Sequence, residues 1–200
     1  MKRTIRLGIS LAGLAALLIG LSSRAPIARA AVHTAAPPAG EVVDSTWQHH
    51  KVSFNYVGFT TLYTCDGLED QVRQILLHLG ARKDVHVTAT GCPGPFNEPS
   101  HDAFVDADFY TLAPATDSAG TAAVKARWTA LQLTSHHPGF MGDGDCELVR
   151  EMKDLITKNF SLRNVDYRTD CFPHDVTLDE FSVKVQALRA SPQITAAATG

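Results

Sequence analysis

The chain has 200 residues, of which 44% are hydrophobic and 20% charged, with a formal charge of −3 when His is neutral. The first thirty residues hold five of the 18 Lys and Arg residues and no Asp or Glu, so residues 31–200 have a formal charge of −8. Such an acidic chain is poorly suited to phosphate backbones or anionic lipid surfaces, and we expect no nucleic-acid partner.

Residues 1–30 have the organisation of a signal peptide. Lys2, Arg3 and Arg6 precede an apolar run over 7–21, and residues 28–30 form an A-x-A cleavage site before Ala31. That run has 15 residues, fewer than the roughly 20 that span a bilayer, which favours cleavage over an uncleaved anchor. We predict export to a bacterial periplasm or the medium, with no stable membrane insertion after cleavage.

The first half of the mature chain contains one helix among strands. Residues 31–45, rich in Ala and Pro, indicate a disordered leader to a single domain over 46–190. A strand is expected over 51–64 and a helix over 66–79, with Asp66 as its cap, Glu69 as a capping-box partner and Gly80 as its stop. Alternating apolar residues predict strands over 85–91 and 103–112.

The second half repeats this order. A strand is expected over 124–133, then a helix over 147–160 capped by Asp145, then a strand with Val165, Tyr167 and Thr169 on its inner face, and a last strand over 181–187. The repeats cover about 51–112 and 122–188, and residues 191–200 indicate a disordered tail. The sequence predicts an α+β two-layer sandwich of two strand–helix–strand–strand units, with two helices on one face of a mostly antiparallel sheet.

Four cysteines occupy equivalent positions in the two halves. Cys65 and Cys146 each precede a helix, and Cys92 and Cys171 each follow the next strand. An even number of cysteines in an exported chain predicts two disulfides, for which three pairings are possible. In a split β-α-β unit the helix start and the end of the next strand lie at one sheet edge, which favours Cys65–Cys92 and Cys146–Cys171.

Candidate reactive groups are few. Cys65 at a helix start is a candidate nucleophile, although its equivalence to Cys146 favours a disulfide. Asp106 and Asp108 share a strand face, an arrangement that serves glycoside hydrolysis and also occurs on solvated faces. Residues 142–145 resemble a calcium loop but fail the EF-hand spacing, because Leu148 stands where Gly is required.

Two adjacent-histidine pairs, His49-His50 and His136-His137, are candidate metal ligands, although neighbours on a strand point to opposite faces. We therefore predict no metal, no cofactor and no catalytic residue. Loops carry binding more often than core elements do, and two loops, 93–102 and 136–145, concentrate Pro, Gly, His, Asp and Phe. The predicted binding residues are Phe96, His136, His137 and Phe140.

The sequence also resembles a family of exported proteobacterial proteins to which no activity is assigned. The resemblance covers about 50–190 and rests on the motif TCDGLE at residues 64–69, LGAR at residues 79–82 and Cys92, and on residues 145–148 and 163–165 in the second half. It implies export and a shared fold, without catalytic residues. We expect a non-catalytic binding or envelope-associated module with a protein partner in the envelope. The alternatives are a small exported hydrolase and a metal-handling periplasmic protein.

Overall fold

The structure, a computed structural model, describes residues 40–93, 98–115, 123–172 and 180–191. All of them belong to one compact unit of the chain. The predicted signal peptide, most of the predicted leader and nearly all of the predicted tail lie outside the described residues.

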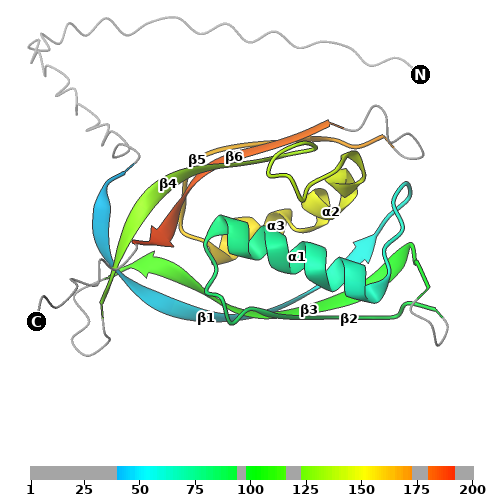
Figure 1. Ribbon diagram of the computed structural model, residues 1–200, viewed down its shortest axis with the longest axis horizontal. Helices are drawn as coiled ribbons and strands as arrows, with labels where there is room; N and C mark the ends of the chain where they lie inside the picture. Colours follow the sequence, from blue (N-terminus) through cyan, green and yellow to red (C-terminus); the bar gives the residue numbers. More distant parts are fainter. Residues whose placement is uncertain (1–39, 94–97, 116–122, 173–179, 192–200) are drawn as a thin grey trace, which may run out of the picture. The chain divides into compact units, whose positions relative to one another are not determined.

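Among these residues, six strands form one antiparallel sheet that is accompanied by three α-helices (Figure 1). The strands are β1 (Val42–Val57), β2 (His86–Thr90), β3 (Asp102–Pro114), β4 (Val124–Thr134), β5 (Leu162–Asp170) and β6 (Glu180–Ala190). The helices are α1 (Cys65–Leu79), α2 (Cys146–Glu151) and α3 (Lys153–Asn159), with a short 3-10 turn, η1 (Asp143–Asp145), before α2. The predicted α+β fold class is confirmed.

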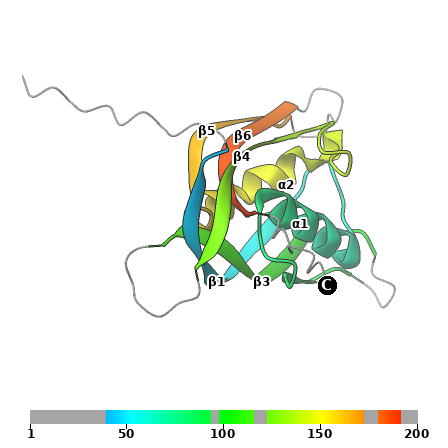
Figure 2. The same ribbon diagram turned by 60° about the vertical axis from the view of Figure 1, so that its left-hand side comes forward.

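The sheet has the order β2-β3-β1-β4-β6-β5, and it bends at its centre (Figure 1). The strand β1 pairs with β3 over 13 residues but with β4 over only four, Val42 to Ser45. Because the centre is held by this short ladder, the two halves of the sheet diverge, and the helices lie between them (Figures 1 and 2). Both faces of the helical layer are therefore covered by strands.

The two halves of the sheet are related by an approximate two-fold axis. From β1 to the loop after α1, residues are separated from their equivalents by 81 positions, as in Trp47 and Trp128 at the same point of β1 and β4. Asp44 pairs with Lys125, which is its own counterpart, so the axis passes through this pair. Their side chains form an ion pair of 2.7 Å. The strand order, read outward from the centre, is the same in each direction.

Most of the core is one apolar cluster shared by both halves. The helix α1 contributes a stripe at helical spacing, and α2 and α3 contribute the matching side chains of the second half. A smaller cluster lies across the two-fold axis and consists of Leu112, Ala126, Trp128 and Leu188, with Val43, Trp47 and Val124 packed against it. This second cluster holds the two half-sheets together where the ladder is shortest.

Both predicted disulfides, Cys65–Cys92 and Cys146–Cys171, are present. Each closes the start of a helix onto the end of the following strand, as the split β-α-β geometry predicts. Disulfides are typical of oxidising compartments, so they indicate an extracytoplasmic location for the folded chain. Within the described part of the chain, no helix is both long and apolar enough to cross a membrane.

Several element boundaries differ from the prediction. The strand β1 begins at Val42 rather than 51 and ends at Val57, so residues 42–45 of the predicted leader are strand. Their composition resembles that of a leader, and they are ordered by distant contacts, mainly the pairing with β4. The predicted second helix is divided at Met152, although the hydrogen bond from its N–H to the Leu148 carbonyl continues the helical path.

On β5, Val165 is 47% exposed instead of facing inward. The register of β5 on β6 shifts between Arg163 and Asp166, and Asn164 within that shift has a φ of 51°. This irregularity breaks the alternation on which the inner face was predicted. Beyond it, Tyr167 and Thr169 are half-buried, as expected.

The helix caps also differ from the prediction. Thr64 caps α1 by accepting a hydrogen bond from the Gly67 N–H, because the helix begins at Cys65 rather than Asp66. Glu69 instead accepts from the Ala89 N–H at 2.8 Å and so ties α1 to β2. The predicted stop at Gly80 is confirmed.

Candidate functional site: a cationic cavity at the end of α1

The structure brings together two of the residues predicted to bind. His137 and Phe140 both approach His78 on α1, with ring centroids 6.4 and 6.0 Å away. His136 is exposed beside them in the chain, and Phe96 lies outside the described residues. The assignment of these residues to a binding surface stays a prediction.

Each member of the acidic pair on β3 has polar partners on the neighbouring strand β1. Asp106 and Asp108 line a surface cavity of about 280 Å³. Asp106 accepts a hydrogen bond from Ser53, and Asp108 lies 2.6 Å from His49 and 3.3 Å from Lys51. The hydrogen bond to His49 is the main cause that holds the pKa of Asp108 below its usual value. A glycosidase pair needs one carboxyl group with a raised pKa to act as acid, and the partners of Asp108 shift its pKa in the opposite direction.

The two histidines of the pair His49-His50 contact different residues. His49 contacts Asp108, whereas the Nε2 atom of His50 lies 2.9 Å from the Thr111 hydroxyl. Among the described residues, no group of three or more His, Cys, Asp or Glu side chains is placed to hold a metal ion. Cys65 is joined to Cys92, so it has no thiol to serve as a nucleophile.

In the segment 142–145, which resembles a calcium loop, the acidic side chain of Asp145 makes hydrogen bonds within the protein. The carboxylate of Asp145 is buried and accepts hydrogen bonds from the Tyr63 hydroxyl, the Gln71 amide at 2.8 Å and the Gly142 N–H at 2.7 Å. Burial raises the pKa of Asp145, and burial together with the charge of Asp145 raises the pKa of Tyr63. Tyr63 and Gln71 belong to the first half, so Asp145 joins the two halves instead of capping α2.

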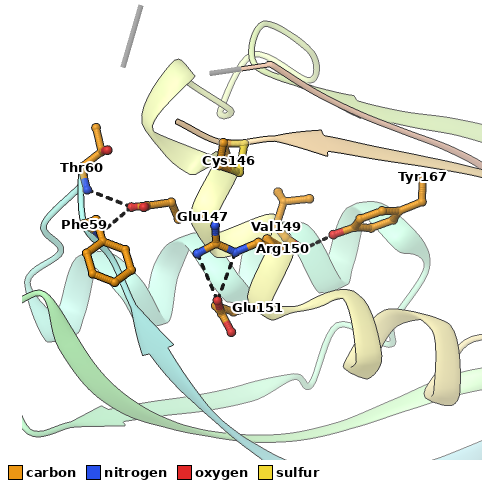
Figure 3. Close-up of polar contacts among 9 residues, drawn as sticks. Phe59, Thr60, Cys146, Glu147, Val149, Arg150, Glu151 and Tyr167 are labelled. Carbon is orange, nitrogen blue, oxygen red and sulfur yellow. Dashed lines mark hydrogen bonds and ion pairs between the residues drawn. A yellow bond between two sulfur atoms is a disulfide. The ribbon is translucent and has the colours of Figure 1, made fainter. Parts of the chain in front are cut away.

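A second buried carboxylate also joins the halves. Glu147, 1% exposed at the start of α2, accepts hydrogen bonds from the backbone N–H groups of Phe59 and Thr60 at 2.9 and 3.0 Å (Figure 3). Its other oxygen, Oε1, has no hydrogen-bond partner among the described residues. The Thr60 hydroxyl donates to the Phe172 carbonyl, next to Cys171. Glu147 therefore holds the loop after β1 against the second disulfide.

A cavity of about 490 Å³ lies where α1 ends against β6. Gly80 makes this approach possible, because its φ of 106° favours glycine and a Cβ there would lie 2.7 Å from the Leu188 carbonyl oxygen. The next residue in β6, Arg189, is thereby brought to the end of the helix. The lining residues are Trp47, Arg73, Leu77, Gly80, Ala81, Arg82, Lys83, Arg189 and Ala190.

Arg82 is fixed as one wall of the cavity. Its guanidinium carbon lies 3.6 Å from the ring centroid of Tyr110 and 5.7 Å from that of Trp47, which are cation–π distances. Its Nε and Nη2 atoms donate to Asp84 at 2.7 and 2.6 Å. These hydrogen bonds hold the pKa of Asp84 below its usual value, so Asp84 stays ionised and offsets the charge of Arg82.

The other three cations have no such partner. Arg73 on α1, Lys83 in the loop after it and Arg189 on β6 have no carboxylate within 4 Å in the described part of the chain. Arg189 also lies directly opposite Arg127 in the β4–β6 ladder. The end of α1 supplies only about half a negative charge. The cavity is therefore strongly positive, although residues 31–200 have a formal charge of −8.

The equivalent positions of the second half are neutralised. Arg163, the counterpart of Arg82, lies 3.8 Å from the Trp128 ring centroid and 3.4 Å from Glu41. The counterparts of Arg73 and Leu77 are Asp154 and Lys158, which pair with each other at 2.7 Å. The Arg–Trp contact thus belongs to the scaffold, whereas the excess of cations is found at the end of α1 and not at the equivalent end of α3.

The sequence prediction missed this cavity because its four cations come from three separate elements. Two signals were available. Arg82 and Lys83 directly follow the predicted helix stop, and the Trp and Arg of each half recur at a spacing of 81 residues. Arg189 could not be found in this way, because its position beside Gly80 depends on how the half-sheets bend.

No protein-family model, curated protein or solved structure matches this chain. The resemblance to exported proteobacterial proteins accordingly stays a prediction.

Proposed function

We propose that this protein is a non-catalytic binding protein, exported to a bacterial periplasm or the surrounding medium, and that the cavity at the end of α1 binds an anionic small molecule. The observation that carries the proposal is the convergence of Arg73, Lys83 and Arg189 on a cavity whose lining includes no acidic residue. The signal-peptide features of residues 1–30 and the two disulfides support export.

Size and lining favour a small ligand. A volume of about 490 Å³ lies within the roughly 300–1,000 Å³ typical of small-molecule sites, and such sites combine apolar walls with a few polar groups. Trp47 and Leu77 supply the apolar wall here. Like charges that converge without partners repel each other, so an anion that enters the cavity gains their attraction and removes their repulsion.

Binding of anilinonaphthalene sulfonate, an aromatic anion, tests the proposal. We expect the mature protein to bind this dye with its near-ultraviolet circular dichroism unchanged, which separates site binding from loosening of the fold. The double variant Arg73→Gln/Arg189→Gln should bind it at least about tenfold more weakly, because hydrogen bonds to charged groups contribute about 1.5–3 kcal/mol each.

The matched control is Lys158→Gln/Arg168→Gln, which removes the same charge from exposed positions outside the cavity. We expect this control to retain affinity for the dye. Equal losses in both double variants would show that net charge alone attracts the dye and would refute the cavity as the site.

A further inference from the structure

We propose that the ligand of the cationic cavity is a phosphomonoester with an apolar or aromatic body. This inference rests on the proposed function and specifies its ligand. Two features of the cavity carry it, namely the number and kind of its unpaired cations and the apolar wall beside them.

The charges call for a head group with more than one negative charge. Arg73, Lys83 and Arg189 line the same cavity from three elements, so their charges surround one space. A phosphomonoester carries about 1.5–2 negative charges at neutral pH and three strong acceptor oxygens, whereas a carboxylate or phosphodiester carries one charge. Arginine guanidinium groups match phosphate oxygens in pairs, and lysine adds a point charge.

The apolar wall calls for a body attached to that head group. Trp47 on β1 and Leu77 on α1 are both half-buried and both line the cavity. Leu77 lies three residues before the Gly80 stop. Arg82 is held against Tyr110 and paired with Asp84, so it contributes a flat side wall rather than a free charge. A ligand with an aromatic or aliphatic body can cover these surfaces while its phosphate meets the cations.

The second half shows that the fold does not require these charges. Asp154 and Asn164 stand at the counterpart positions of Arg73 and Lys83. The registers of β1–β3 and β4–β6 make Leu112 the counterpart of Leu188, and hence Ala113 that of Arg189. The same scaffold therefore forms with none of the three cations, and their presence around the end of α1 is explained by a ligand.

Calorimetric titration of the mature protein with three probes tests the inference, at a pH well above the second phosphate pKa of about 6. Phenyl phosphate has both parts, methyl phenyl phosphate has the same body with one charge fewer, and inorganic phosphate has no body. We expect phenyl phosphate to bind at least about tenfold more tightly than either of the others. Equal affinity for the singly charged diester, or for inorganic phosphate, would overturn the proposal.

Two variants assign the parts of the ligand to their contacts. In Lys83→Gln/Arg189→Gln, the preference for the monoester over the diester should fall below about threefold. In Trp47→Ala, phenyl phosphate should bind no better than inorganic phosphate. If the wild-type protein binds neither the dye nor phenyl phosphate, the proposed function is refuted. If it binds the dye but does not prefer the monoester, only this inference is refuted.

The same chemistry can come from a soluble metabolite or from a lipid head group. Co-sedimentation with phosphatidylcholine vesicles that contain phosphatidic acid, competed by phenyl phosphate, would assign the lipid source. Binding of phenyl phosphate without co-sedimentation would assign the soluble one. Vesicle binding that phenyl phosphate does not compete would place the contact outside the cavity and contradict the proposal.

Discussion

The two halves of this protein share one scaffold and differ at one place on it. Each half has a disulfide-bonded Cys at the start of its helix, a Trp on its first strand and an Arg in cation–π contact with that Trp, each separated by 81 residues from its counterpart. The end of α1 has unpaired cations around a cavity, contributed by α1, the loop after it and β6, whereas the equivalent end of α3 has the Asp154–Lys158 ion pair. Features present in both halves serve folding, and a feature present in one only is a candidate for function.

A second difference lies at the helix starts. Thr64 is an ordinary N-cap of α1. The side chain of its counterpart, Asp145, does not cap α2 and instead accepts hydrogen bonds from Tyr63 and Gln71 of the first half. Glu147 likewise reaches across to the loop after β1. The second half therefore provides the buried carboxylates that join the halves, whereas the cavity lies between the end of α1 in the first half and β6 of the second half.

The largest expected effect is the loss of a disulfide. Closing loops of 27 and 25 residues stabilises by about 3.5 kcal/mol each in the chain-entropy model, so Cys65→Ala/Cys92→Ala and Cys146→Ala/Cys171→Ala should cost similar amounts from this source. Cys146 is fully buried and Cys65 is not, so we expect the greater loss in the second half. Urea unfolding measures both, and a greater loss in the first half would contradict this assignment.

An intermediate effect is expected at the helix starts. Thr64→Ala should lower the free energy of unfolding by about 1 kcal/mol at every pH, because it removes a neutral cap. Asp145→Asn should instead have a pH-dependent effect. The raised pKa of Asp145 means that the folded protein retains this proton above the unfolded value of about 4.

The sign follows from proton linkage. From about pH 4 up to the raised pKa, the unfolded state binds fewer protons at this site, so its contribution to the free energy of unfolding falls as the pH rises. The wild-type value minus the Asp145→Asn value should therefore decrease across this window, as measured by urea unfolding at several pH values. A difference that grows with pH would show that the three hydrogen bonds to Asp145 outweigh its burial.

The sequence was sufficient for elements with strong local signals. The stripe on α1, the Gly80 stop, the alternation on β2 to β4 and the paired cysteines each depend on residues close in the chain or on a repeated order. Features that depend on distant contacts were not predictable. The start of β1 requires β4, and the roles of Asp145 and Glu147 require the loop after β1.

The binding prediction shows the same limit. Loop composition directed it to Phe96, His136, His137 and Phe140, because exposed aromatic and His residues are visible in a sequence. The cavity is formed by an ordinary helix end and an ordinary strand end, and neither has an unusual composition. Only the bend of the sheet, which places Arg189 beside Gly80, makes them neighbours.

The smallest expected effect tests whether the cavity charges oppose folding. Arg189→Gln and Lys158→Gln each remove one positive charge, from the cavity and from the ion pair at the counterpart positions. Arg189 lies opposite Arg127 and near other cations, so Arg189→Gln should raise the melting temperature at low salt. The corresponding gain in the free energy of unfolding should be less than about 0.5 kcal/mol. Lys158→Gln should lower it slightly, because it leaves Asp154 unpaired. Both changes should vanish near 1 M salt, where the screening length is about 3 Å. If both substitutions lowered the melting temperature, the cavity cations would contribute to folding, and the contrast between the halves would no longer identify a site.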